Sequence, residues 1–349
     1  MRYEIFPFSS NDETDWEKFV NNHKETTIFH TIGWKKVIEL TFGFKPEYLV
    51  VKDSDNNLVG ISPAFNIKTF FGRVIVSQPF FEYGGPIVDI EFGEAYEDIL
   101  NFYKNKCDRE RIDYAELRVL PNNENINFDK FGYVKQFKAY DFYIDIKGKN
   151  YEKDIWFGLY TKKSRVRNSV RNAIEDGVRV SEEKNIDVYY ELYLKTMAKL
   201  GTPPMPKFLF ENIAKYTKAR FTFAYLKDVP IGGMMSFPFN NRDLMVGLVS
   251  DENYLNYRGN DVLYNEQIEY ATNNRFDVVD FGRTRPDSDY ERYKKKWGAT
   301  RVEMFSYIYP PSAGEHANPY KNYDLFSRFT KKMPWMLTKI GPYVAKKFP

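Results

Sequence analysis

The stretch Leu244-Met-Val-Gly-Leu-Val-Ser-Asp-Glu-Asn-Tyr-Leu-Asn-Tyr-Arg-Gly-Asn-Asp-Val-Leu263 decides the fold that we predict. It begins as an apolar strand, continues as a polar loop and ends in the apolar spacing of a helix. A strand, a loop and a helix in this order leave backbone N–H groups at the helix start, where the helix dipole favours an anion. We therefore predict a strand over 243–249, a helix over 261–273, and an anion site between them.

The residues at this helix start are the candidates for binding the donor of a transferred group. We assign Tyr257, Arg258, Gly259 and Asn260 to this role, because a cation and a small residue there suit a phosphate, pyrophosphate or carboxylate. The alternative is an ordinary capped helix with Asn260 as the cap. The sequence alone leaves both interpretations open.

A second segment, Asp277-Val-Val-Asp-Phe-Gly-Arg-Thr-Arg285, predicts a buried strand followed by a turn and then by a short basic helix. Ligands bind beyond the carboxyl ends of strands in open sheets, so a carboxylate and arginines that emerge there suit an anionic substrate. We assign Asp280, Arg283 and Lys294 to catalysis, with Lys294 steadying the oxyanion that forms when an amine attacks an activated carbonyl. The alternative is that Asp280 caps the turn and the lysine run is a solvated face.

A third segment, 161–177, predicts a helix that carries an apolar stripe and a parallel row of cations. The stripe consists of Val166, Val170 and Ile174. The row consists of Lys163, Arg167 and Arg171. Such a row suits the phosphates of a nucleic acid or a lipid head group, and we assign it to substrate binding. Solvent-facing charges, partly paired with Glu175, are the alternative.

The two halves of the chain predict the same order of helices, hairpin, strand, helix and strand. The turn at Asp53–Asn57 in the first half corresponds to the turn at Lys227–Pro230 in the second. We predict an α/β (α+β) fold with two lobes, 1–148 and 149–310, each a mixed, mostly antiparallel sheet flanked by helices. A basic aromatic tail, 311–349, packs on the first lobe or contacts an anionic membrane surface.

Composition excludes several classes of protein and site. The 349 residues are 43% hydrophobic and 18% aromatic, which indicates packed domains rather than disorder. The single cysteine, Cys107, excludes an intramolecular disulfide, and the three histidines lack metal-ligand spacing, so we expect no metal. No apolar run has the length of a signal peptide or a membrane span. We expect a cytoplasmic protein, with any membrane association peripheral at the inner face.

Several segments, in a shared order, resemble the FemAB-like transferases of the GNAT acyltransferase superfamily, which include peptidoglycan-bridge aminoacyltransferases. Phe29-His-Thr-Ile-Gly-Trp34 resembles the segment before the family's first Trp, and Tyr83-Gly-Gly-Pro86 its first-lobe pocket loop. Arg167-Asn-x-x-Arg-Asn-Ala173 resembles its basic helix, and Phe281-Gly-Arg283 its late strand. Tyr293-Lys-x-x-Trp-Gly298 resembles its Phe-Lys-x-x-Phe/Trp-Gly element.

The resemblance implies tandem GNAT-like lobes and the formation of an amide on an amine of a cell-envelope or exopolysaccharide precursor, such as one of peptidoglycan. Tyr83, Gly84 and Arg167 would line the acceptor side. The co-substrate would be aminoacyl-tRNA or acyl-CoA, with no permanently bound cofactor and no DNA partner. This chain lacks the long helical hairpin that some tRNA-using members insert in the second lobe, because 182–216 is too short and is interrupted by Gly201-Thr-Pro-Pro-Met-Pro206.

Two other functions fit the same residues. One is an acyl-CoA-dependent N-acetyltransferase that acts on a small amine or an amino sugar. The other is a GNAT-like module without catalysis that binds anionic lipid or polysaccharide machinery through its basic helix and tail.

Overall fold

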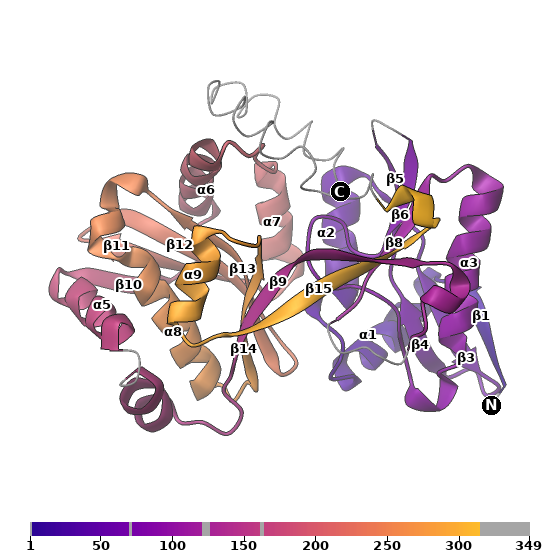
Figure 1. Ribbon diagram of the computed structural model, residues 1–349, viewed down its shortest axis with the longest axis horizontal. Helices are drawn as coiled ribbons and strands as arrows, with labels where there is room; N and C mark the ends of the chain where they lie inside the picture. The colour runs from indigo at the N-terminus through magenta and orange to yellow at the C-terminus, as the bar shows by residue number, and fades with distance from the viewer. Residues whose placement is uncertain (1, 70–71, 121–125, 161–163, 315–349) are drawn as a thin grey trace. The chain divides into compact units, whose positions relative to one another are not determined.

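The computed structural model describes residues 2–69, 72–120, 126–160 and 164–314 (Figure 1). The chain forms two compact units. Among the described residues, unit 1 takes those up to Lys138 and 303–314, and unit 2 takes Ala139–Val302. The chain therefore passes from one unit to the other inside strands β9 (Val134–Asp145) and β15 (Thr300–Tyr309). The predicted lobes, 1–148 and 149–310, have their boundaries shortly after these two points. Most of the predicted tail lies outside the described residues.

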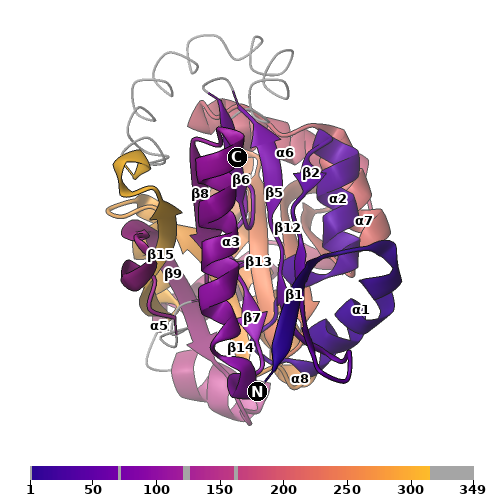
Figure 2. The same ribbon diagram turned by 90° about the vertical axis from the view of Figure 1, so that its right-hand side faces the viewer.

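Unit 1 contains two sheets, with strand orders β1-β3-β4-β7 and β15-β8-β6-β5-β2. Its other strands are β1 (Tyr3–Pro7), β2 (Lys45–Pro46), β3 (Leu49–Asp53), β4 (Leu58–Ser62), β5 (Phe65–Lys68), β6 (Arg73–Val76), β7 (Ile87–Val88) and β8 (Tyr114–Arg118). Its helices are α1 (Glu13–Asn22), α2 (Ile32–Phe42) and α3 (Ala95–Glu110). Helix α3 packs its buried face on β6 and β8 (Figure 2).

Unit 2 is built on one sheet with the strand order β10-β11-β12-β13-β14-β9. Its strands are β10 (Val178–Glu182), β11 (Arg220–Leu226), β12 (Val229–Phe239), β13 (Arg242–Ser250) and β14 (Val278–Thr284). Its helices are α5 (Ser164–Glu175), α6 (Ile186–Leu200), α7 (Lys207–Tyr216), α8 (Gly259–Asn273) and α9 (Asp289–Lys296), after a π-helical segment at Tyr151–Leu159. The predicted strand over 243–249 and helix over 261–273 correspond to β13 and α8.

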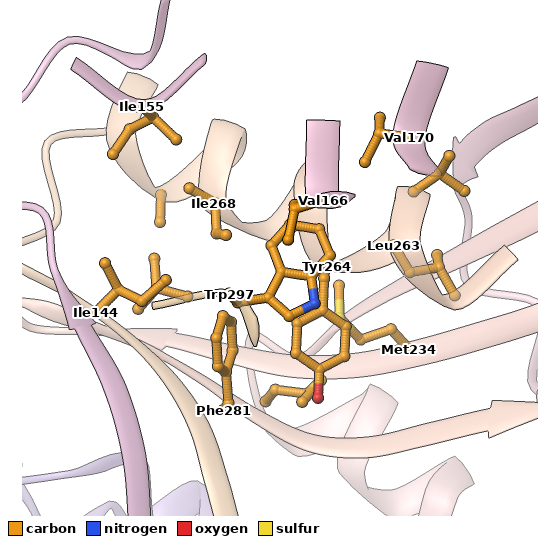
Figure 3. Close-up of a cluster of buried hydrophobic side chains, with 14 of the residues drawn as sticks. Ile144, Ile155, Val166, Val170, Met234, Leu263, Tyr264, Ile268, Phe281 and Trp297 are labelled. Carbon is orange, nitrogen blue, oxygen red and sulfur yellow. The ribbon is translucent and has the colours of Figure 1, made fainter. Parts of the chain in front are cut away.

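Side chains alternate between the two faces of this sheet, as they must in a strand. Ala224 belongs to the core that α5 and α8 share with the sheet. Figure 3 shows Val166 of α5 and Leu263 of α8 in this core. Phe221 and Phe223 instead contact Tyr189 of α6. The sheet therefore has α5 and α8 on one face and α6 on the other.

The two units repeat one order of elements. In unit 1, β1 pairs with β3 and β3 with β4, all antiparallel, and α1 and α2 lie between β1 and β3 in the chain. In unit 2, β10, β11 and β12 pair in the same way, with α6 and α7 inserted. Helix α3 then connects the parallel strands β6 and β8, as α8 connects β13 and β14. The predicted tandem lobes, mixed and mostly antiparallel, are confirmed.

The last strand of each unit comes from an unexpected place in the chain. The C-terminal part of β9 follows β8 in sequence but pairs antiparallel with β14 of unit 2. Likewise, Ser306–Tyr309 of β15 follow unit 2 in sequence but pair antiparallel with β8 of unit 1. Each unit is completed by a strand that the order of elements along the chain would assign to the other.

The predicted apolar stripe on α5 included Ile174, and this assignment is wrong. Val166 and Val170 are buried, but Ile174 is 58% exposed and Ala173 is buried in its place. With 3.6 residues per turn, the third position of a buried stripe lies seven residues after the first rather than eight.

Charged residues meet in the interior of unit 2. Arg220 on β11 donates to Glu182 at 2.8 Å and to Glu266 on α8 at 2.6 Å. Asp243 on β13 is fully buried, with its carboxylate 3.9 Å from the same guanidinium. Burial raises the pKa of the Asp243 carboxyl to about 7, and Arg220 only partly opposes this effect. Asp243 therefore titrates near neutral pH.

This predicts a pH-dependent stability that Asp243→Asn removes. The carboxyl ionises near its ordinary pKa of 3.8 in the unfolded chain but near 7 in the folded one, so the folded state loses stability as the pH rises between these values. Relative to the variant, the free energy of unfolding of the wild type should fall by a few kcal/mol over this range, at roughly 1.4 kcal/mol per pKa unit.

Urea unfolding at a series of pH values measures this difference. Asp228→Asn, at a fully exposed aspartate of the same unit, is the control and should follow the wild type. Parallel curves for wild type and Asp243→Asn would show that the pKa of Asp243 stays at its ordinary value.

Among the described residues, no helix has both the length and the apolar character needed to cross a membrane.

Candidate active site

Strands β13 and β14 run side by side for only three residue pairs and then separate. Their parallel pairing ends at Leu244 and Asp280. Beyond this point β13 remains paired with β12 as far as Ser250, while its other edge makes no ladder with β14 in the described chain. The three residues Val246–Leu248 are partly exposed, directly after the buried 243–245. Beyond Leu244, the edge of β13 that faced β14 therefore has backbone N–H and C=O groups outside any ladder of the described strands.

A bulge in each strand fixes this separation. In β13, Met245 and Gly247 pair with successive residues of β12, which leaves Val246 as an extra residue. In β14, the register with β9 shifts between Asp280 and Arg283, where one residue is extra. Bulges bend strands and redirect them, and they are common beside active sites. The bulges in β13 and β14 lie close to the end of the ladder between these two strands, and they separate the strands from this point onward.

Gly282 lies at the bulge in β14 and cannot be replaced without strain. Its φ is +69°, in the left-handed region, and a Cβ atom there would lie 2.6 Å from the carbonyl oxygen of Met245. Only glycine combines this conformation with so close an approach of two backbones. The point at which the strands separate is therefore determined by one residue.

Two of the predicted catalytic residues hold the β14 bulge in shape. Lys294 is buried, and its ammonium donates to the carbonyl oxygens of Phe281, Gly282 and Arg283 at 2.5, 2.8 and 3.2 Å. Asp280 accepts a hydrogen bond from the Gly282 N–H at 2.7 Å and pairs with Arg242, so it does cap the turn. The geometry favours positioning roles for both, and their direct participation in catalysis stays a prediction. The side chain of Arg283 is exposed.

The predicted donor-binding residues do lie at the start of α8. Arg258 has a left-handed φ of 60° and forms an ion pair of 3.0 Å with Asp176. A Cβ atom on Gly259 would lie 3.1 Å from Ile231 Cδ1, so the glycine lets α8 pack closely on β12 rather than serving only an approaching phosphate. Tyr257 precedes them and is partly buried.

Asn260 lies within the first turn of α8, after the capping position, which Arg258 occupies. The alternative interpretation of Asn260 as the cap is therefore wrong. Its Oδ1 atom is buried and has no hydrogen-bond partner among the described residues.

Asp261 ties the first turn of α8 to two other helices. Its carboxylate accepts hydrogen bonds from Ser169 of α5, from the Tyr293 hydroxyl of α9 at 2.5 Å, and from Lys296 at 2.7 Å. Burial and the charge of Asp261 raise the pKa of Tyr293 well above its ordinary value, so its hydroxyl remains a donor. These bonds hold the start of α8 in place beside the strand separation.

In unit 1 the corresponding parallel strands are β6 and β8. The segment that follows β6 packs against the end of β8. After β6, Ser77 Oγ accepts from the Arg118 N–H at 2.8 Å, and the Gly84 N–H donates to the Arg118 carbonyl at 3.0 Å. A Cβ atom on Gly85 would lie 2.5 Å from Val119. Tyr83 and Gly84, which we assigned to substrate binding, belong to this segment and are buried. Their role in substrate binding stays a prediction.

The predicted basic row is only partly described. Lys163 lies outside the described residues. Arg167 is half-buried, whereas Arg171 is exposed and lies 3.8 Å from Glu175, as the solvated alternative expects. The role of this row in substrate binding stays a prediction.

The bulge in β13 is the functional feature that the sequence interpretation missed. Gly247 is a lone glycine inside an apolar strand, a pattern that often marks a bulge or a close approach. Tyr189, whose hydroxyl lies against Gly247, carries no such signal in the sequence.

The comparisons with known proteins agree with this geometry. Residues 161–295, which contain β10 to β14 and most of α9, match the family model described as an acetyltransferase (GNAT) domain. FemX has the same fold over 90% of this chain and 99% of its own, with a TM-score of 0.69 and 15% sequence identity. The chain carries a GNAT acyltransferase domain in a FemAB-like fold. The predicted family resemblance and the prediction of an acyltransferase are thereby confirmed.

Two further structures share the FemAB-like fold. The C-terminal domain of a candidate lysylphosphatidylglycerol synthetase from Agrobacterium fabrum has a TM-score of 0.61 and 8% identity, over 88% of this chain and 94% of its own. A tandem GNAT protein from the clavulanic acid biosynthesis pathway has a TM-score of 0.51 and 11% identity, over 88% and 98%. No curated protein matches the chain by sequence.

Gly282→Ala tests the strand separation. The substitution should lower the free energy of unfolding by more than the roughly 1–2 kcal/mol that a left-handed conformation costs alanine, because the Met245 carbonyl must also move. Gly148→Ala is the matched control, since Gly148 has a φ of +67° but nothing within 4 Å of an added Cβ atom. Equal losses in thermal or urea unfolding would show that the close approach carries no strain.

Lys294→Met tests the positioning role of the lysine. The variant leaves three β14 carbonyls without their donor, so the free energy of unfolding should fall by about 1–3 kcal/mol. Lys295→Met is the control, because Lys295 is half exposed and its ion pair among the described residues is with Glu291 on the same helix. A stable Lys294→Met protein would favour a purely catalytic role.

Proposed function

We propose that the chain is an acyl or aminoacyl transferase that forms an amide on an amine of a cell-envelope or exopolysaccharide precursor. The observation that carries the proposal is the edge of β13 at the partly exposed Val246–Leu248, which lies outside the ladder with β14 where the two strands separate. This is the one place among the described strands of unit 2 where two parallel neighbours part beside a helix start. Backbone donors fixed by a bulge suit the oxygen of a reacting carbonyl.

The reaction needs no covalent enzyme intermediate. The amine nitrogen attacks the carbonyl carbon, the carbonyl electron pair moves onto the oxygen, and the bond to the donor's sulfur or oxygen then breaks. The leaving group takes up a proton as the amine gives one up. The protein's share is to hold amine and carbonyl together and to stabilise the oxyanion. The single thiol fits this scheme, because Cys107 is buried in unit 1 and burial raises its pKa to about 12.

The donor's phosphates would bind at the start of α8. Arg258 supplies a cation there, and the helix dipole adds to its attraction for an anion. Its present partner, Asp176, is an exposed carboxylate that a phosphate could replace. The bonds of Asp261 to α5 and α9 keep this helix start in a fixed position.

Two donors remain candidates. The neighbour from Agrobacterium fabrum is named as a lysylphosphatidylglycerol synthetase. This name supports an aminoacyl group as the group transferred and an envelope component as the acceptor. The match to the acetyltransferase domain family supports the second candidate function, an acyl-CoA-dependent N-acetyltransferase on a small amine or amino sugar.

Thermal unfolding with a panel of ligands tests the proposal and separates the donors. The panel contains CoA, acetyl-CoA, charged tRNA and nucleotide-linked envelope precursors. A true donor at 100 times its Kd stabilises the folded chain by about 2.7 kcal/mol, which raises Tm by several degrees. Arg258→Ala should weaken donor binding roughly 10- to 100-fold, since it removes a charged hydrogen bond.

The matched control is Arg179→Ala, which removes an exposed arginine paired with Asp228 and should bind the donor like the wild type. Stabilisation by CoA that depends on Arg258 would identify an acyl-CoA enzyme. Stabilisation by charged tRNA or by a precursor would support aminoacyl transfer. No shift with any ligand would contradict an acyl transferase and favour a binding module.

A further inference from the structure

Tyr189 of α6 is among the largest fully buried side chains of unit 2. It is 1% exposed, and its ring packs against Phe210 and Phe221 with centroids 5.3 and 5.2 Å apart. Its hydroxyl forms no hydrogen bond with any residue that the structure describes. The ring is therefore held firmly, while its hydroxyl has no hydrogen-bond partner in the part of the chain that the structure describes.

The hydroxyl of Tyr189 lies against the bulge in β13. A Cβ atom built on Gly247 would lie 2.2 Å from the hydroxyl oxygen. The hydroxyl therefore occupies the space that the side chain of any other residue at position 247 would need. Gly247 is the middle residue of the partly exposed stretch Val246–Leu248. The hydroxyl thus lies beside the backbone that is open to a substrate.

Helix α6 is fastened along the same strand. Thr196 Oγ1 accepts from the Ser250 N–H at 3.0 Å, and Lys195 pairs with Asp251 at 2.9 Å. These contacts lie two turns after Tyr189 on the helix and three to four residues after Gly247 on the strand. They fix the distance of the tyrosine from the bulge.

The Tyr189 hydroxyl has no role in the packing of the ring. A phenylalanine would pack its ring against Phe210 and Phe221 equally well, so the packing of α6 gives no reason for a hydroxyl at this position. The other tyrosines of the helix do have partners, since Tyr190 and Tyr193 both bond to the backbone of Met205. A partner for Tyr189 supplied by a bound molecule would account for the difference.

We propose that the Tyr189 hydroxyl donates a hydrogen bond to the oxygen of the reacting carbonyl, as a second donor beside the backbone N–H groups of the β13 bulge. This inference rests on the proposed function. As the amine attacks, the carbonyl electron pair moves onto this oxygen, and the tyrosine stabilises the charge without giving up its proton. Burial raises the pKa of Tyr189 far above its ordinary value, so the hydroxyl acts as a donor and not as a base.

Tyr189→Phe tests the inference because it removes the oxygen and keeps the ring. With the donor and acceptor that the ligand panel identifies, kcat should fall roughly 100- to 1,000-fold, the loss typical of an oxyanion donor. The donor's Kd and the melting temperature should stay unchanged, because the ring and its contacts with Phe210 and Phe221 are kept.

Tyr48→Phe is the matched control. Tyr48 is a buried tyrosine of unit 1 whose hydroxyl also lacks a partner among the described residues, so its loss should leave kcat unchanged. Gly247→Ala is a second test, because its methyl group must displace the Tyr189 hydroxyl and should also lower kcat.

The outcomes separate this inference from the proposed function. If the wild type transfers an acyl group and Tyr189→Phe keeps its kcat, the inference is overturned and the proposed function stands. If kcat and melting temperature of Tyr189→Phe fall together, the tyrosine is structural and the inference is again overturned. If the wild type transfers nothing from any donor, both proposals fall.

Discussion

At Gly282 the backbone of β14 comes so close to the Met245 carbonyl of β13 that no side chain fits between them, and the chain turns away in a left-handed conformation. The parallel ladder ends one pair earlier, which exposes the edge of β13 from Val246 onward. At this turn three carbonyl oxygens of β14 accept hydrogen bonds from the buried ammonium of Lys294. One close contact between two backbones thus explains the bulge, the buried lysine and the accessible strand edge, and the proposed chemistry depends on all three.

The repeated architecture gives an internal comparison. Both units have a parallel pair of strands connected by a helix, yet in unit 1 the chain after β6 bonds to Arg118 and packs Gly85 against Val119. In unit 2 the ladder of β13 with β14 ends at Leu244, and the Tyr189 hydroxyl lies against Gly247 just beyond it. The same arrangement of strands therefore supports a filled core in one unit and an accessible edge in the other. This difference is why the proposed acyl-transfer site lies in unit 2.

Much of the fold follows from local patterns in the sequence. Apolar spacing predicted β13, α8 and the hairpins, and the turn residues at Asp53–Asn57 and Lys227–Pro230 predicted how the hairpins close. The bulges, the partners of Lys294 and the placement of Tyr189 could not be predicted in this way, because each depends on residues far apart in the chain. The pairing of β9 with β14 was missed for the same reason, since the order of elements along the chain suggests another partner. Of the assigned site residues, those at the start of α8 and on β14 do lie beside the strand separation, but their contacts indicate positioning and packing as much as chemistry.

We propose that the partly exposed edge of β13 binds the reacting carbonyl. A crystal structure of the chain with a non-transferable ketone analogue of the donor that stabilises it would test this claim most directly. The account predicts the ketone oxygen at about 3 Å from a backbone nitrogen of Val246–Leu248, on the side of the strand that faces β14. A well-ordered analogue whose carbonyl lies elsewhere, away from this edge, would contradict the account.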